Sequence, residues 1–257
     1  MRVLNYNKLT EAIQSWIKNY VFSANANGVV LGLSGGIDSS VTAALCVNAI
    51  GNKNVMGLGL PCESVSQDLE DAKLIADHLG IKLTIINLEN SYNQLVQSLS
   101  PYFEPNKISK ANIKPRLRMI SLYYVAQSID NYLVAGTGNR SELAIGYFTK
   151  YGDGGVDFEP LGMLYKGEVK EIAKQLKLPE RIIKKPPSAG LWPGQTDEGE
   201  IGISYSELDE ILYRLDHKLE INDLNEKKVE KVKSMIASTN HKLKVPPVFE
   251  VDNNMSD

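Results

Sequence analysis

Short apolar runs alternate with amphipathic stretches along the first 137 residues, and this alternation constrains the fold more than any other feature of the sequence. The apolar runs predict buried strands at 28–33, 55–61, 82–88 and 131–137. The helical spacing of apolar residues predicts helices at about 7–22, 37–50, 65–79, 91–103 and 115–129. This pattern indicates an α/β fold, a doubly wound and mostly parallel sheet with helices on both faces.

The remainder of the chain is richer in turns. Gly, Asp and Pro are frequent through 147–160 and 184–199, and two helices follow near 208–215 and 229–236. Pro115 is expected in the first turn of its helix, where a missing N–H costs nothing. Because no repeat or linker interrupts the chain, we expect a single domain over residues 1–257, with a frayed tail at about 248–257.

Composition excludes several functional classes. A net charge of −3 argues against a nucleic-acid partner, and two separated cysteines, Cys46 and Cys62, do not suit a disulfide scaffold or a structural zinc site. No apolar run reaches the ~18 residues of a membrane span, and the N-terminus lacks the apolar segment of a signal peptide. We therefore expect a soluble cytoplasmic protein without a membrane partner.

The loop after the first strand, GLSGGIDSS at 32–40, is the most informative motif. Gly35 and Gly36 allow the backbone to approach a ligand, and the helix that starts near Ile37 offers N–H groups to an anion. The lysine of a P-loop is missing, and Asp38 would repel a bare phosphate unless it holds Mg²⁺. The alternative is an ordinary glycine-rich turn between a strand and a helix.

The motif SGGIDS resembles the pyrophosphate loop of the N-type ATP pyrophosphatases, which have an adenine nucleotide alpha hydrolase-like fold and transfer AMP. Longer blocks at 136–166, 114–119 (KPRLRM) and 185–209, with His241-Lys242, are similar to the ammonia-dependent NAD synthetases over residues 5–249. The sequence departs from the usual family pattern at Pro115, at Asn139-Arg140-Ser141 and at Leu243.

The resemblance implies an ATP site and a metal site. The residues implied to bind ATP are Gly32, Leu33, Ser34, Gly35, Gly36, Ile37, Asp38, Ser39, Thr137, Lys166 and Ser188. Asp38 and Glu142 follow different strands at one sheet edge, so the two carboxylates could hold one Mg²⁺. Ser141-Glu142 also has the pattern of an ordinary helix start, and Lys166 that of a solvated lysine.

The resemblance also implies contacts to the second substrate, nicotinic acid adenine dinucleotide (deamido-NAD). Matching positions are Arg116, Lys150, Asp157, His241 and Lys242. Arg118 is two residues from Arg116, so the two side chains should point to different faces of their helix, with Arg118 as structural support. The alternatives are a surface turn around Lys150 and a solvated tail around His241.

The segment at 186–199 is rich in Pro and Gly, carries Trp192, and is expected to be a lid that excludes water. Asp197 and Glu198 lie on it, and one of them, preferably Asp197, could deprotonate ammonium; the alternative is an acidic pair at a helix start. The implied catalytic residues are thus Asp38, Lys166 and Asp197.

The implied activity is amidation of deamido-NAD by free ammonia through an acyl-adenylate, because only 33 residues precede Ser34 and leave no room for a glutaminase. The family also implies a homodimer with the substrate near the interface, for which the helix with Leu122, Tyr123, Tyr124 and Val125 is a candidate. Two other functions stay open, a tRNA-modifying ATP pyrophosphatase and a non-catalytic nucleotide-binding module.

Overall fold

The structure is a computed structural model, and it describes residues 2–192 and 194–250. Its described residues form one parallel sheet in the order β3-β2-β1-β4, from strands β1 (Gly28–Gly32), β2 (Val55–Gly59), β3 (Lys82–Ile85) and β4 (Tyr132–Val134). Val30 lies between Met56 of β2 and Val134 of β4. The predicted parallel sheet is confirmed, although each strand ends one to three residues earlier than predicted.

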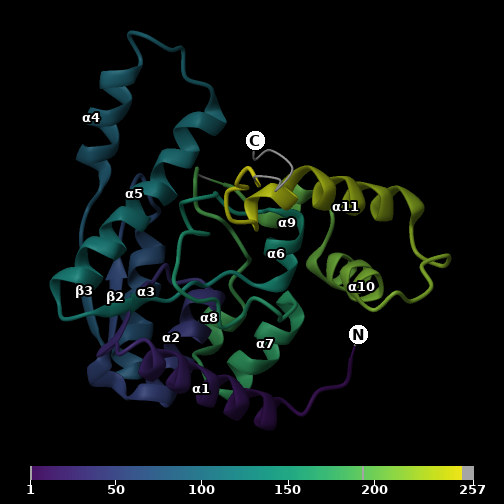
Figure 1. The fold of residues 1–257 in the computed structure, drawn as a ribbon, viewed down its shortest axis with the longest axis horizontal. Coiled ribbons are helices and arrows are strands. Elements are labelled where there is room, and N and C mark those ends of the chain that lie inside the picture. Colours follow the sequence, from purple (N-terminus) through teal and green to yellow (C-terminus); the bar gives the residue numbers. More distant parts are fainter. Residues whose placement is uncertain (1, 193, 251–257) are drawn as a thin grey trace, which may run out of the picture.

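Helices cover the sheet and extend beyond it (Figure 1). They are α1 (Tyr6–Ser23), α2 (Ile37–Ile50), α3 (Ser66–Leu79), α4 (Glu89–Leu99), α5 (Lys107–Ser128), α6 (Arg140–Ile145), α7 (Lys166–Gln175), α8 (Glu180–Ile183), α9 (Asp197–Ile201), α10 (Tyr205–Asp216) and α11 (Glu226–Thr239). Short 3₁₀ turns at Asn52–Asn54 and Asn240–Lys242 complete the regular structure of the described residues.

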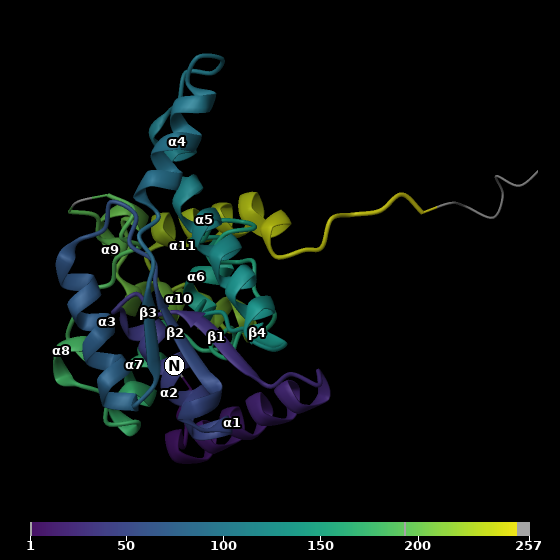
Figure 2. The same cartoon turned by 90° about the vertical axis from the view of Figure 1, so that its left-hand side faces the viewer.

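The two faces of the sheet pack against different helices, as the doubly wound pattern predicts. Val29 and Leu31 of β1 enter a core with apolar residues of α1, α2 and α7, whereas Val30 enters a second core with α4 and α5. This alternation follows from the two-residue period of a strand, so a fully apolar strand can be buried on both faces. In Figure 2, α4 and the start of α5 project beyond the body of the molecule.

A third apolar cluster supports the loops that follow β4. Ile145 of α6 packs with Leu208 and Leu212 of α10 and with Val232 of α11. Helix α10 begins at a capping box in which Ser204 and Glu207 satisfy each other's backbone N–H groups. The cluster lies on the right in Figure 1, away from α4 and α5.

The expectation that Pro115 begins a helix is wrong. Helix α5 begins at Lys107, where the Asn106 side chain caps it by accepting from the Ser109 N–H, and Pro115 lies inside the helix. Pro115 has no N–H to donate to the carbonyl of residue 111, but it is buried together with Ala111 and Lys114. Tertiary packing and a good cap therefore extend the helix across the proline.

Most of the residues predicted for a dimer interface on α5 are partly buried against the core. Leu122, Tyr123 and Val125 lie on the face of α5 that is turned toward the sheet, and they pack against the apolar cluster there. The outer face carries Ile120 and Tyr124, which are 58% and 72% exposed. Tyr124 is therefore the most exposed residue of the predicted set, and the interface itself stays a prediction.

No helix among the described residues has the length and apolar character needed to cross a membrane. At the C-terminal end, Val248 and Phe249 are exposed and belong to no helix or strand, and the fraying of this tail stays a prediction. The rest of that predicted tail, 251–257, lies outside the described residues.

Candidate active site

The loop between β1 and α2 has a shape that only glycine allows. Gly35 has φ +75°, and a Cβ there would lie 2.4 Å from the Asp68 carbonyl oxygen. Gly36 is the N-cap of α2 and has no side chain to occupy the first N–H groups of the helix. The Ser34 and Ser39 hydroxyls lie 3.0 Å apart and hold the loop closed. This geometry at the carboxyl end of β1 leaves N–H groups available to an anion, and the anion cradle stays a prediction.

Asp38, Glu142 and Lys166 meet beside this loop. The Lys166 Nζ lies 2.5 Å from Asp38 Oδ2 and 2.8 Å from Glu142 Oε1. The three side chains come from the first turns of α2, α6 and α7, and Lys166 is only 2% exposed. The sheet edge therefore brings together the predicted carboxylates, and the lysine lies between them.

Burial and charge act in opposite directions on this group. Burial raises the pKa of Glu142 to about 7, although the Lys166 ammonium opposes the shift. Burial alone would lower the pKa of Lys166, but the Asp38 and Glu142 carboxylates more than offset it, so its pKa lies above the ordinary value. Lys166 is consequently a permanent cation in the site.

Sequence reasoning missed Asn139 as a member of this group. Its Nδ2 donates to Asp38 Oδ1 at 3.0 Å, and its Oδ1 caps α6 by accepting from the Glu142 N–H at 3.1 Å. Asn139 is fully buried and links the two carboxylate loops. The available signal was the spacing Asn-x-x-Glu, which is typical of a helix start.

Tyr205 is a second missed residue, and it joins the lid segment (186–199) to the carboxylate group. Its hydroxyl lies 3.0 Å from Glu142 Oε1 and 3.0 Å from Asp197 Oδ2, and its ring faces the Lys166 ammonium. Asp197 is 3% exposed, and burial raises its pKa. Its Oδ1 is buried without a hydrogen-bond partner, so it can still accept a proton donor.

Glu198 has a different role from Asp197. Its carboxylate accepts from the Tyr205 N–H at 2.8 Å, so it caps the start of α10. The side chain of Glu198 is exposed, whereas Asp197 points into the interior. Of the two predicted acids, only Asp197 contacts the group around Glu142.

The other predicted ATP residues are close in sequence to this group but make fewer contacts. The loop that carries Thr137 is held by Glu159, which accepts from the Gly138 N–H at 3.0 Å. A Cβ on Gly136 would lie 2.3 Å from that carboxylate. The Ser188 hydroxyl donates to the Gln195 carbonyl at 2.8 Å and thus closes the lid segment on itself.

Lys185 at the base of the lid segment was also missed. Its Nζ contacts Asp68 Oδ1 at 2.8 Å and Asp71 Oδ2 at 2.6 Å, and it donates to the Gly35 carbonyl at 3.2 Å. These contacts tie the lid segment to the glycine loop. No periodic pattern in the sequence indicates them.

Four of the five predicted dinucleotide residues form a second group near the C-terminal end. The Lys150 ammonium donates to the His241 carbonyl at 2.9 Å. Lys242 donates to the carbonyls of Gly146 and Phe148 at 2.7 and 2.8 Å. Arg116 is exposed and makes long contacts of 3.4 Å to the Lys150 carbonyl.

Asp157 does not join that group. Its carboxylate accepts from the Val134 N–H at 2.7 Å and from the Tyr123 hydroxyl at 3.0 Å, so it supports β4 and α5. Arg118 donates to the Leu60 carbonyl at 3.1 Å, on another face of α5 from Arg116. The predicted separation of the two arginines is confirmed, and Arg118 holds the loop between β2 and α3.

The donor set suits a hard cation. Asp38 and Glu142 offer carboxylate oxygens at a phosphate-binding edge, which is the chemistry of a Mg²⁺ site. The described residues contain no group of three or more His, Cys, Asp or Glu side chains that could hold a metal ion. A metal here would therefore need oxygens from the phosphates as well.

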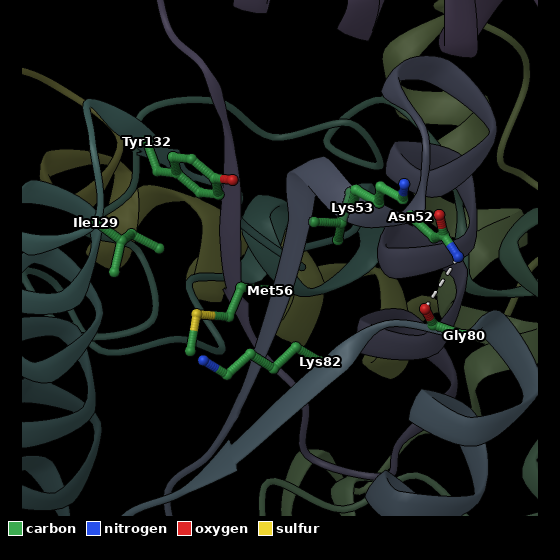
Figure 3. Close-up of a pocket in the computed structure, with 8 residues that line it drawn as sticks. Asn52, Lys53, Met56, Gly80, Lys82, Ile129 and Tyr132 are labelled. Atoms are coloured by element: carbon green, nitrogen blue, oxygen red, sulfur yellow. Dashed lines mark hydrogen bonds between the residues drawn. The ribbon is translucent and has the colours of Figure 1, made fainter.

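A separate cavity lies at the opposite, amino edge of the sheet. It has a volume of about 390 Å³, and its lining includes Asn52, Lys53, Met56, Lys82 and Tyr132 (Figure 3). It contains none of the predicted site residues. The predicted residues Asp38, Glu142 and Lys166 instead meet at the carboxyl edge of the sheet.

Comparisons with known proteins point to one family. The family described as NAD synthase matches residues 9–246. An NH₃-dependent NAD(+) synthetase from Carboxydothermus hydrogenoformans is 50% identical over 96% of this chain and 99% of its own length. Among solved structures, an NMN synthetase from Francisella tularensis is 34% identical with TM-score 0.89, covering 97% of this chain and 100% of that one. An NH₃-dependent NAD synthetase from Campylobacter jejuni is 33% identical with TM-score 0.83, covering 96% and 100%.

Proposed function

The chain belongs to the NAD synthase family, and we propose that it amidates deamido-NAD with ammonia, forming NAD, AMP and pyrophosphate from ATP. The observation that carries the proposal is the meeting of Asp38, Glu142 and Lys166 beside the glycine loop. A cation fixed between two carboxylates and next to a helix N-terminus can stabilise the negative charge that develops on the phosphates during the reaction.

The chemistry proceeds in two steps. A carboxylate oxygen of deamido-NAD attacks the α-phosphorus of ATP, and pyrophosphate leaves towards the loop of Ser34–Ser39 and the N-terminus of α2. Ammonia then attacks the acyl carbon, and AMP leaves with one oxygen of the original carboxylate. No side-chain nucleophile is needed, so the protein acts by positioning the substrates and by neutralising charge.

Lys166 and a divalent cation share that neutralisation in our proposal. Asp38 and Glu142 would hold Mg²⁺, which would neutralise phosphate charge when bound. The family resemblance assigns Lys166 to the ATP phosphates, and its ammonium lies beside the same two carboxylates. Ser188 and Thr137 are assigned to ATP by family resemblance alone.

Asp197 is the proposed acceptor of the ammonium proton. Ammonium must lose a proton before it can attack, and a buried carboxylate with a raised pKa is suited to remove it. The buried Oδ1 of Asp197 is available for this contact, while Glu198 is occupied in capping α10.

We propose that a second copy of the chain completes the dinucleotide site. Arg116 and Lys150 are close together, but Asp157 supports β4 elsewhere, so these residues do not converge within one chain. Ile120 and Tyr124 provide an exposed apolar face on α5. Sedimentation should show a dimer that Tyr124→Lys weakens, whereas a monomeric wild type would contradict this arrangement. We also propose a cytoplasmic location for the protein, on the basis of its proposed substrates.

The test of function supplies the pure protein with ATP, ammonium and Mg²⁺, and offers deamido-NAD or nicotinic acid mononucleotide as acceptor. The mononucleotide is included because the similar Francisella protein is an NMN synthetase. We expect equal amounts of AMP and NAD, with deamido-NAD preferred. A preference for the mononucleotide would show that it, and not deamido-NAD, is the acceptor. Failure to form AMP with either acceptor would refute the proposal.

A further inference from the structure

Lys114 is a buried cation that the proposed reaction does not use. It is the first residue of KPRLRM and lies on α5, with only 4% of its surface exposed. Buried lysines need a specific partner, because removing an ammonium group from water is costly. The partners of Lys114 therefore indicate what the residue does.

Lys114 joins two loops that are far apart in the sequence. Its Nζ donates to the Leu191 carbonyl of the lid segment at 2.7 Å. It also lies 2.8 Å from Glu63 Oε2 in the loop between β2 and α3. The Tyr92 ring of α4 lies 5.4 Å away and adds a weak cation–π contact.

The contact with Leu191 is at the tip of the lid segment, next to Trp192. The Lys107 ammonium lies 3.7 Å from the centre of the Trp192 ring, so two lysines of α5 hold the tip. The base of the same segment is held separately, by Lys185 at the glycine loop and by Tyr205 at Asp197. Of the two lysines that contact the tip, Lys107 is exposed and Lys114 is buried.

The loop on the other side is conformationally constrained. Glu63 has φ +53°, a backbone conformation that non-glycine residues adopt at a cost. Its carboxylate is 46% exposed, but its ion pair with Lys114 fixes the direction of the loop. Arg118 holds the same loop through the Leu60 carbonyl.

We propose that Lys114 is a positioning residue that latches the lid segment to the β2–α3 loop and so keeps water from the acyl-adenylate. The inference rests on the proposed function. With the latch in place, the adenylate reacts with ammonia. When the tip is released, water attacks the same acyl carbon, so deamido-NAD and AMP form and ATP is consumed without an amide product.

The first test measures docking of the tip without using the reaction. The chain has two tryptophans, so Trp16→Phe leaves Trp192 as the single reporter. In that background, Lys114→Met should raise acrylamide quenching of Trp192 by about twofold or more, as the ring becomes exposed. Lys110→Met, an exposed lysine on the same helix, is the matched control and should change nothing.

The second test measures coupling as AMP released per amide product. Wild type and Lys110→Met should stay near one, whereas Lys114→Met should reach about two or more. Glu63→Gln removes the ion pair from an exposed position, so it should shift both measurements in the same direction even if Lys114→Met folds poorly.

Unchanged quenching in both latch variants would overturn the proposal, as would reduced turnover with the coupling ratio still near one. Increased quenching in a protein that never forms AMP would leave the latch standing and refute the proposed function instead.

Discussion

The ATP side and the dinucleotide side of the candidate site are built differently. On the ATP side, Asp38, Asn139, Glu142 and Lys166 are joined by direct contacts of 2.5–3.1 Å between side chains or from a side chain to a backbone N–H. On the dinucleotide side, the hydrogen bonds of the Lys150 and Lys242 ammonium groups go to backbone carbonyls, each ammonium also lies over an aromatic ring, and Arg116 is exposed.

The difference indicates which half is preformed. Charged groups that are buried and mutually satisfied keep their geometry without a ligand, which favours pre-organised charge stabilisation. Partly buried cations bound to carbonyls can exchange those partners for a ligand's phosphates. We therefore expect substitutions on the ATP side to reduce turnover and those on the other side to weaken acceptor binding.

The largest effect should come from Asp38→Asn. Lys166 would lose one of its two carboxylates and the proposed Mg²⁺ one of its ligands, so kcat should fall about 10³-fold while the fold is retained. Turnover and circular dichroism measure the two properties. Asp77→Asn, at an exposed position of α3, is the control. Near-normal Mg²⁺-dependent turnover of Asp38→Asn would contradict the claim that substitutions on the ATP side reduce turnover.

Asp197→Asn should affect one substrate selectively. We expect kcat/KM for ammonium to fall about 10²-fold, because the proposed proton acceptor is lost. The KM values for ATP and deamido-NAD should change little in steady-state kinetics with each substrate varied in turn. Glu198→Gln is the matched control, since Glu198 caps α10. A loss spread evenly over all three substrates would assign Asp197 a purely structural role.

Lys150→Met should act on the dinucleotide side alone. We expect the KM for deamido-NAD to rise about tenfold with the KM for ATP unchanged, because a cation proposed to bind the acceptor is removed. Lys73→Met, at an exposed lysine of α3, provides the comparison. If the KM for ATP rose equally, the two sides would not be separate.

The smallest effect concerns stability. Burial raises the pKa of Glu159 to about 8 from its ordinary 4.5, although the Gly138 N–H opposes the shift. Between these values the folded state holds a proton that the unfolded chain has released, so stability falls as pH rises. Glu159→Gln removes this titration. Between about pH 5 and about pH 8 the variant should gain about 3–6 °C in Tm relative to wild type.

A wild-type Tm that follows the variant across this pH range would show that Glu159 does not carry the proton. Glu89→Gln, at an exposed position of α4, controls for the loss of one negative charge.

Much of the ATP side could be predicted from the sequence, because local patterns specify it. Apolar runs indicate the strands, and the carboxyl ends of parallel strands share one edge, so Asp38 and Glu142 were expected together. The residues that connect elements could not be found in this way. Tyr205, Lys185 and Lys114 contact partners 8 to 150 positions away, and no periodicity indicates such contacts.

Tertiary context also overrode two local expectations. Pro115 favours a helix start, but the Asn106 cap and the burial of Pro115 place it inside α5. The sequence could not separate Asp197 from Glu198, because adjacent residues point in different directions only once α9 is docked.

The most direct test of the central claim follows the oxygen of the acceptor. Deamido-NAD labelled with a heavy oxygen isotope in its carboxylate is converted with ATP and ammonium, and the products are analysed by mass spectrometry. An acyl-adenylate mechanism predicts one labelled oxygen in each AMP and none in pyrophosphate. Unlabelled AMP, or label in a phosphate product, would contradict it.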